Sequence, residues 1–112
     1  MTIIEKEKDG ILELSISGRL DAVTAVEADK DFNNIINEGH KSLLINLTEL
    51  DYISSAGLRV LLIVAKRIQH NNGQVVLCAL SENVNEVFEI SGFSSIFSIF
   101  ANPEEALSSL KA

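Results

Sequence analysis

Apolar residues recur with two different periods along the chain, and these periods predict where strands and helices lie. Four segments carry short alternating or continuous apolar runs, which are typical of strands: "TIIEKEKDGILELSISG", "SLLINLT", "QVVLCAL" and "SIFSIF". The first of these holds two strands, and the last alternates as an edge strand should. Between them, apolar residues recur every three or four positions, as on one face of a helix. The predicted order is ββαβαβαβα.

Turn and cap residues mark the ends of these elements. Asp9-Gly10 lies between two apolar alternations, which is a strong hairpin signal. Thr24 and Glu27 match a capping box at the start of the first helix. That helix has one apolar stripe, made of Ala25, Ala28, Phe32, Ile35 and Ile36. Further helix ends are predicted at Gly39, Asn71-Asn72-Gly73 and Gly92, and further starts at Ser81 or Asn83 and at Pro103.

Strands that alternate with helices predict an α/β fold. We expect a mixed β-sheet with parallel central strands, right-handed crossovers and about four helices. The chain has 112 residues, of which 46% are hydrophobic, enough for one packed core. It contains no internal repeat, low-complexity run or linker-like stretch, so residues 1–112 are expected to form one domain.

Membrane and nucleic-acid functions are disfavoured by the composition. No uninterrupted apolar run is longer than Val60–Ala65, which is far too short to span a bilayer. The N-terminal stretch lacks the pattern of a signal peptide, so a cytoplasmic protein without membrane insertion is expected. A net charge of −7 repels nucleic acid and anionic lipid. It favours a basic or mixed-charge protein as the partner.

Metal, cofactor and enzyme chemistry also find little support. Cys78 lies in an apolar strand, where a buried and unreactive thiol is expected. His40 and His70 lie where helices are expected to end, and with one cysteine they make no conventional metal cluster. The chain has no P-loop, no G-x-G-x-x-G and no nucleophile elbow. Both histidines belong at the opposite edge of the sheet from the serines described next, so we expect no enzyme and no cofactor.

The segment "LDYISSAGLRVLLIVAKR" holds the candidate site. Ser54-Ser55-Ala56-Gly57 connects a strand to a helix, and open α/β sheets bind ligands at such connections. The first turn of a helix has unsatisfied N–H groups and a partial positive charge. A serine there can cap the helix, or it can carry a phosphate that the helix end tolerates. The segment by itself is compatible with both roles.

The helix that follows has two faces. Its core face is predicted to hold Leu58, Leu61, Leu62, Ala65 and Ile68. A second stripe contains Ser55, Arg59, Ile63 and Lys66 or Arg67. If Val60 and Ile63 are partly exposed, the serine lies at the edge of an apolar patch that carries an arginine, as protein interfaces do. Neighbouring helices could instead bury both residues.

Three segments together resemble a known family, the small single-domain anti-sigma factor antagonists of bacteria, which have the STAS fold. They are "SGRLDAVTA", "LLINLTELDYISSAGLRVLL" and "GQVVLCALSENVNEVFEISGF", in the family's order and spacing. The resemblance implies a partner switch. The unmodified antagonist binds an anti-sigma factor that is also a serine kinase and so frees a sigma factor. Phosphorylation by that kinase separates the two proteins, and a serine phosphatase resets the switch.

The resemblance also implies which residues act. The family's usual loop reads Asp-Ser-(Ser/Thr)-Gly-Leu, with the first serine phosphorylated. Alignment on Gly57-Leu58 makes Ser55 the acceptor, with Ser54 as the alternative. Asp21 matches an aspartate of the family beside the same surface. The partner-binding set is then Asp21, Ser54, Ser55, Ala56, Gly57, Arg59 and Ile63.

Two positions depart from the family's loop. Ser54 replaces the aspartate, and Ala56 replaces the second hydroxyl residue. Arg59, where many members have a small residue, could pair with a phosphate on Ser55 or contact the partner. The missing aspartate leaves an alternative open, a STAS module that binds a protein or ligand constitutively, without phosphorylation.

Overall fold

Six strands and four helices make up the chain in a computed structural model, which describes residues 1–111. The strands are β1 (Thr2–Lys8), β2 (Ile11–Leu20), β3 (Ser42–Asn46), β4 (Leu50–Ile53), β5 (Gln74–Cys78) and β6 (Ser98–Phe100). The helices are α1 (Thr24–Asn37), α2 (Ser55–His70), α3 (Glu82–Ser91) and α4 (Pro103–Lys111), with a 3₁₀ turn at Phe93–Ser95. The fold is the mixed α/β class that the sequence predicts.

The strands form one sheet in the order β1-β2-β3-β5-β6, and β4 also pairs with β2. Only β1 and β2 are antiparallel, and they form the predicted hairpin, with positive φ angles at Asp9 and Gly10. The remaining neighbours are parallel. β3 pairs with the first half of β2, and β4 pairs with its last residues, Gly18–Leu20. The carboxyl ends of β2 and β4 therefore lie together.

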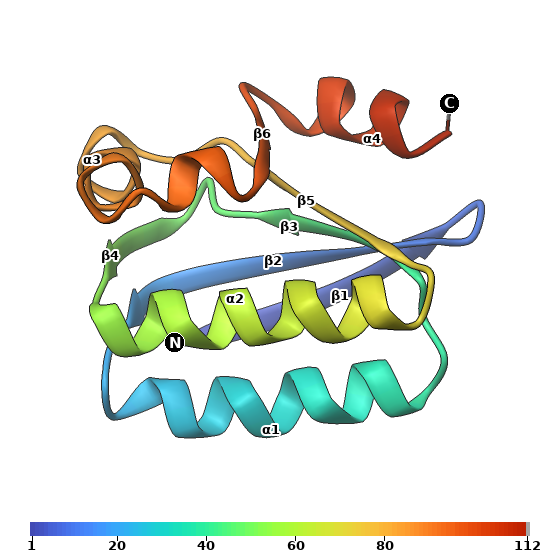
Figure 1. Cartoon of the computed structure of the whole chain (residues 1–112), viewed down its shortest axis with the longest axis horizontal. Helices are drawn as coiled ribbons and strands as arrows, with labels where there is room; N and C mark the ends of the chain where they lie inside the picture. Colours follow the sequence, from blue (N-terminus) through green and yellow to red (C-terminus); the bar gives the residue numbers. More distant parts are fainter. Residues whose placement is uncertain (112) are drawn as a thin grey trace.

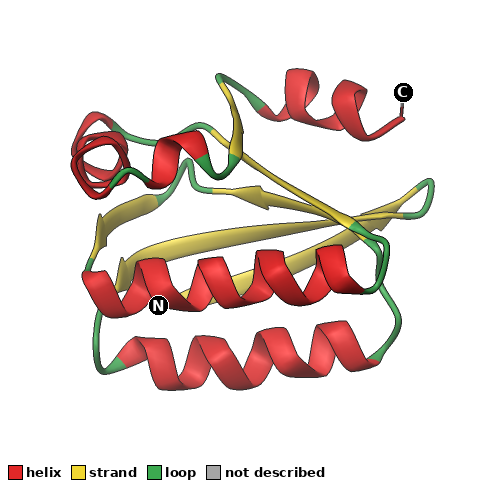
Figure 2. Ribbon diagram, in the orientation of Figure 1, coloured by secondary structure: helices red, strands yellow, loops and turns green. Residues whose placement is uncertain are grey.

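The helices cover the two faces of the sheet. Figure 1 shows α1 and α2 side by side on one face, with their N-termini at the same end, and α4 on the other face. α3 lies beyond β4, near the end where α2 begins (Figure 2). Both helix starts, at Thr24 and Ser55, thus lie at one edge of the sheet.

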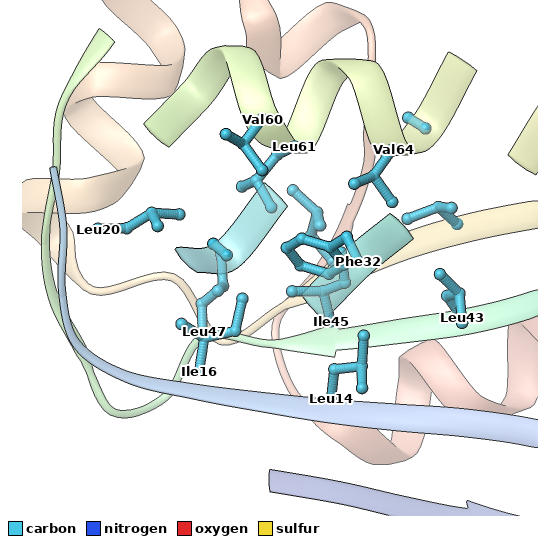
Figure 3. Packing of buried hydrophobic residues seen from close by; sticks show 14 of the residues in the cluster. Leu14, Ile16, Leu20, Phe32, Leu43, Ile45, Leu47, Val60, Leu61 and Val64 are labelled. Atoms are coloured by element: carbon cyan, nitrogen blue, oxygen red, sulfur yellow. The ribbon is translucent and has the colours of Figure 1, made fainter. Parts of the chain in front are cut away.

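The main core lies between the sheet and the pair α1 and α2. Figure 3 shows Phe32 of α1 between Val64 of α2 and the strand residues Leu14 and Ile45. The predicted apolar stripe of α1 is buried in full. A smaller core under α4 contains Ile11, Leu44, Val76, Cys78 and Ala106. Cys78 is buried, as the sequence predicts, and burial raises the pKa of its thiol to about 11, which disfavours the reactive thiolate.

β4 is the element that the sequence pattern missed. It is only four residues long, and Asp51 and Tyr52 are exposed, so no apolar run marks it. Its hydrogen bonds go to β2, more than thirty residues earlier in the chain, and such a partner leaves no local signal. The observed order is therefore ββαββαβαβα.

Two local predictions were wrong. The capping box of Thr24 and Glu27 does not form, because Thr24 is already the first helical residue and Val23 makes no side-chain cap. In "SIFSIF", only Ser98–Phe100 is a strand, although it lies at the edge of the sheet as predicted. The preceding residues turn instead, since the amides of Ile96 and Phe97 both donate to the carbonyl of Phe93, and Phe97 packs edge-on against Phe88.

The other predicted boundaries are confirmed. Ser81 caps α3 by accepting from the Val84 amide, Gly92 ends that helix in the left-handed region, and Pro103 opens α4. Gly39 follows α1 with a positive φ angle. Within residues 1–111, no helix has the length and hydropathy that crossing a membrane requires.

Candidate functional site

The turn from β4 into α2 is held by backbone hydrogen bonds and a serine cap. The amide of Ser54 donates to the carbonyl of Leu20 at 2.9 Å, which ties the start of α2 to the end of β2. Ser54 has an extended backbone, and its hydroxyl oxygen accepts from the Gly57 amide at 3.3 Å. Ser54 is thus the N-cap of α2, and its own carbonyl accepts the first helical bond, from Leu58.

Gly57 lets the first turn of α2 approach β2 and β4 closely. A Cβ atom at this position would lie 2.6 Å from the carbonyl oxygen of Leu20 and 2.8 Å from that residue's Cγ. It would also lie 2.9 Å from Cγ1 of Ile53. Only a residue without a side chain fits here, because the backbone carbonyl cannot move away without breaking its bond to Ser54.

Ser55 is the first residue of α2, and it is exposed. In the described part of the chain, no protein group is hydrogen-bonded to its hydroxyl, whereas Ser54 is half-buried and occupied as the cap. Of the two roles that the sequence allows for a serine in this turn, the capping role belongs to Ser54. The hydroxyl of Ser55 lies free at a helix N-terminus.

Asp21 lies next to this turn, directly after Leu20. Its carboxylate accepts from the amides of Val23 and Thr24 at 3.0 Å each. The Thr24 hydroxyl lies 3.2 Å from the same carboxylate oxygen and 2.8 Å from the carbonyl of Arg19, and it shares its proton between these two acceptors. The Thr24 hydroxyl in turn accepts from the Asp21 amide at 2.9 Å. This reciprocal pair replaces the predicted capping box. The Thr24 amide above all, then its hydroxyl, the Val23 amide and Arg19, hold the pKa of Asp21 below 3.8.

Arg19 and Tyr52 form a cation–π contact at the same edge of the sheet, and no pattern in the sequence predicts this contact. They are direct neighbours across β2 and β4, and the guanidinium carbon lies 4.2 Å from the centre of the tyrosine ring. The Nε of Arg19 is also 3.7 Å from Asp21. Since the pairing depends on β4, no spacing within the chain could have revealed it.

The candidate residues of α2 divide between exposed and buried positions. Arg59, Ile63, Lys66 and Arg67 are exposed with Ser55, as the predicted stripe requires. Ile63 is 41% exposed, whereas Val60 is 7% exposed and belongs to the core. The predicted patch therefore contains Ile63 and not Val60. Two exposed valines that the pattern did not single out are Val23, directly before α1, and Val26, in its first turn. The start of α1 lies at the same end of the molecule as the start of α2 (Figure 1).

The histidines lie far from this edge. His40 and His70 line a hollow with Gly39, Lys41 and Asn71, at the opposite ends of α1 and α2. The described residues contain no group of three or more potential metal ligands. The structure thus brings Asp21 and the Ser54–Gly57 turn together and keeps both imidazoles away from Ser55.

Comparisons with known proteins agree with this geometry. A family model described as the STAS domain matches residues 2–106. BtrV of Bordetella bronchiseptica, named as an anti-sigma factor antagonist, is 41% identical over 103 residues, which cover 92% of this chain and 89% of that protein. The anti-sigma-B factor antagonist of Staphylococcus aureus is 23% identical over 92 residues, covering 82% and 85%.

Solved structures share the fold. A Thermotoga maritima protein described as an anti-sigma factor antagonist superimposes with a TM-score of 0.93 at 22% identity, covering 98% of this chain and 95% of that one. The phosphorylated form of SpoIIAA, a Bacillus cell fate determinant, gives a TM-score of 0.74 at 19% identity, covering 96% and 98%. At these identities the likeness concerns the fold alone.

Proposed function

Since this chain belongs to the STAS domain family, as its anti-sigma factor antagonist relatives do, we propose that it is an antagonist controlled by phosphorylation of Ser55. Anti-sigma factor antagonists are regulatory proteins that bind anti-sigma factors. In this proposal residues 1–112 act as one cytoplasmic STAS domain. It binds an anti-sigma factor that is also a serine kinase, a phosphatase resets it, and it catalyses no reaction of its own.

The observation that supports the proposal is that the two adjacent serines have different roles. Ser54 caps α2, and within residues 1–111 the exposed hydroxyl of Ser55 makes no hydrogen bond to the protein. A kinase can reach that hydroxyl without opening the fold. A phosphate there meets the free N–H groups and the positive end of the helix, which favour an anion.

Phosphorylation at Ser55 is expected to release the partner and to preserve the domain. A phosphoserine adds about −1.5 to −2 charge and three acceptor oxygens. At the exposed start of α2 this charge is solvated and compatible with the helix dipole. Inside an interface that excludes water the same charge costs on the order of several kcal/mol unless it is paired, enough to change affinity by orders of magnitude.

A constitutive binding module remains the second candidate. It is favoured by Ser54, which stands where the family's loop has an aspartate. Ser54 keeps the capping function, because its hydroxyl accepts from the Gly57 amide. What the substitution removes is a fixed negative charge beside Ser55. If a kinase requires that charge, the protein binds its partner without being switched.

Phosphopeptide mapping of the protein isolated from its native cells separates the two candidates. Wild type, Ser55→Ala and Ser54→Ala are compared under several growth conditions. We expect phosphate in wild type and Ser54→Ala and none in Ser55→Ala. Phosphate that persists in Ser55→Ala and disappears in Ser54→Ala moves the acceptor to Ser54. A wild type without phosphate under every condition refutes the switch.

A Ser55→Asp variant tests the release step. We expect it to keep its circular dichroism spectrum and urea midpoint while it loses at least about tenfold in affinity for the anti-sigma factor. Ser55→Ala is the matched control, because it changes the same side chain without adding charge. Equal affinity of the two variants for the partner contradicts release by charge.

A further inference from the structure

Helix α2 concentrates positive charge in an acidic chain. The whole protein has 16 acidic and 9 basic residues. α2 alone carries Arg59, Lys66 and Arg67, and it has no aspartate or glutamate. All three cations are exposed. Among the described helices, α2 is thus the one whose charged side chains are all cationic.

These cations are not neutralised by the protein itself. Within residues 1–111, the ion pairs are Arg19–Asp21, His40–Glu7, His40–Glu38 and Lys111–Asp9, and none of them includes a residue of α2. Arg67 donates to the side-chain oxygen of Asn33 in α1, a neutral acceptor. The chain thus leaves its α2 cations without carboxylate partners, although carboxylates are abundant.

Apolar side chains lie among the cations. Ile63, 41% exposed, lies on α2 between Arg59 and the pair Lys66 and Arg67. α1 runs beside α2 in the same direction (Figure 1), and Arg67 contacts Asn33. By the same alignment, Asp29 of α1, whose carboxylate accepts from the Asn33 side chain, is at the level of Ile63, and Val26 is at the level of the buried Val60. Val26 is 72% exposed. An apolar centre with arginine at its border is the composition of a protein interface.

We propose that the exposed residues Ser55, Arg59, Ile63, Lys66 and Arg67, here named the α2 docking face, bind an acidic segment of the partner protein. Carboxylates of that segment pair with Arg59 and Lys66, and an apolar side chain covers Ile63. This inference rests on the proposed function, since the partner is the same anti-sigma factor. A short acidic segment can contact α2 alone, so the whole partner can still be the mixed-charge protein that the net charge favours. A nucleic acid or an anionic membrane is disfavoured as the occupant, because it would also meet the rest of the chain, whose net negative charge repels polyanions.

The α2 docking face also explains how a phosphate at its end acts. Ser55 and Arg59 are four residues apart, which makes them neighbours on the helix surface. A phosphate on Ser55 pairs with the guanidinium of Arg59 and removes it from the partner's carboxylate. The phosphate also repels that carboxylate directly. One modification thus cancels an attraction and adds a repulsion.

Photo-crosslinking in the native cells identifies the occupant. A photoreactive amino acid replaces Ile63, and in a control strain it replaces Ile4, which is 62% exposed on β1. We expect position 63 to crosslink to a partner peptide in which Asp and Glu outnumber Lys and Arg. A basic peptide, a nucleic-acid adduct, or no adduct at position 63 overturns the proposal, as does the same peptide recovered equally from position 4.

Charge reversal then measures the contribution of the cations, with the crosslinked partner purified and titrated against unphosphorylated protein. Arg59→Glu with Lys66→Glu is compared with Lys6→Glu with Lys8→Glu on β1; all four positions are exposed, and both double variants lower the net charge equally. We expect a loss of at least about tenfold for the α2 variant and less than about twofold for the β1 variant.

Equal losses in the two double variants mean that only the net charge matters, and no loss in either means that the cations do not contact the partner. Both outcomes overturn the proposal. Urea midpoints confirm that the variants are folded. Because these titrations use unphosphorylated protein, a negative result for the α2 docking face does not contradict phosphorylation of Ser55. Conversely, an absence of phosphate on Ser55 leaves these affinities unchanged.

Discussion

Helices α1 and α2 begin at the same edge of the sheet, but the two N-termini are completed in opposite ways. The turn before α1 is closed by the Asp21 carboxylate, which accepts from two backbone amides and shares a hydroxyl proton, and the first turn also contains Glu27. α2 is capped by the neutral hydroxyl of Ser54 and has no acidic residue in its first turn.

This difference shows which of the two helix N-termini can accept an additional negative charge. The dipole of α1 already meets a fixed carboxylate, so its N-terminus needs no anion from outside. The N-terminus of α2 lacks such a charge and presents the exposed Ser55. We propose that phosphorylation supplies at α2, reversibly, what Asp21 supplies permanently at α1.

The largest effect on this arrangement is expected from Gly57→Ala. The added Cβ would clash with the carbonyl of Leu20 and with the Ile53 side chain, and this clash pushes α2 away from the end of β2, which Asp21 follows directly. We expect a loss of about 1–3 kcal/mol in the free energy of unfolding, measured by urea denaturation. Helix propensity alone predicts the opposite sign, a gain of up to about 1 kcal/mol. An unchanged or higher stability would show that the first turn of α2 can move away from Leu20 and Ile53 at little cost.

A smaller effect, which depends on pH, is expected from Asp21→Asn. The amide oxygen of asparagine still accepts a hydrogen bond, but it carries no charge. Because the pKa of Asp21 is lowered in the native state, its charge stabilises the fold above the unfolded pKa of about 3.9. That contribution is lost as the pH falls through the lower native value.

The wild type should therefore be more stable than Asp21→Asn at pH 6, and the difference should shrink towards pH 3. Urea midpoints measured across this range give the comparison. A difference that stays constant with pH would mean that the Asp21 carboxylate does not stabilise the start of α1 by its charge.

The smallest effects on stability are expected from substituting the two serines, and the informative result is which substitution costs more. Ser54→Ala removes the cap of α2 and should cost about 1 kcal/mol. Ser55→Ala changes an exposed side chain without a bond to the protein, and its effect should stay within about 0.5 kcal/mol. Urea titrations of the two variants, run in parallel, measure the free energy of unfolding that each substitution costs. A greater cost for Ser55→Ala would return the capping role to Ser55 and weaken its assignment as the acceptor.

Much of the fold could be predicted from local sequence patterns, because those patterns reflect interactions between residues close together in the chain. The hairpin at Asp9-Gly10 and the apolar stripe of α1 are examples. β4 was missed because its stability comes from pairing with Gly18–Leu20, which no local pattern encodes. For the same reason the sequence left open whether Val60 is exposed, and the structure shows that neighbouring elements bury it.

By itself, the sequence determined the α/β class, the order of most elements and the polar turn before α2, since periodicity and turn chemistry depend on near neighbours in the chain. Only the tertiary structure decided which serine caps and which is free, and why Gly57 has no side chain. It also decided that Asp21 and the Arg19–Tyr52 pair lie at the same edge. Each of these depends on β2 and β4 ending side by side, and that register is set by hydrogen bonds between segments far apart in the chain.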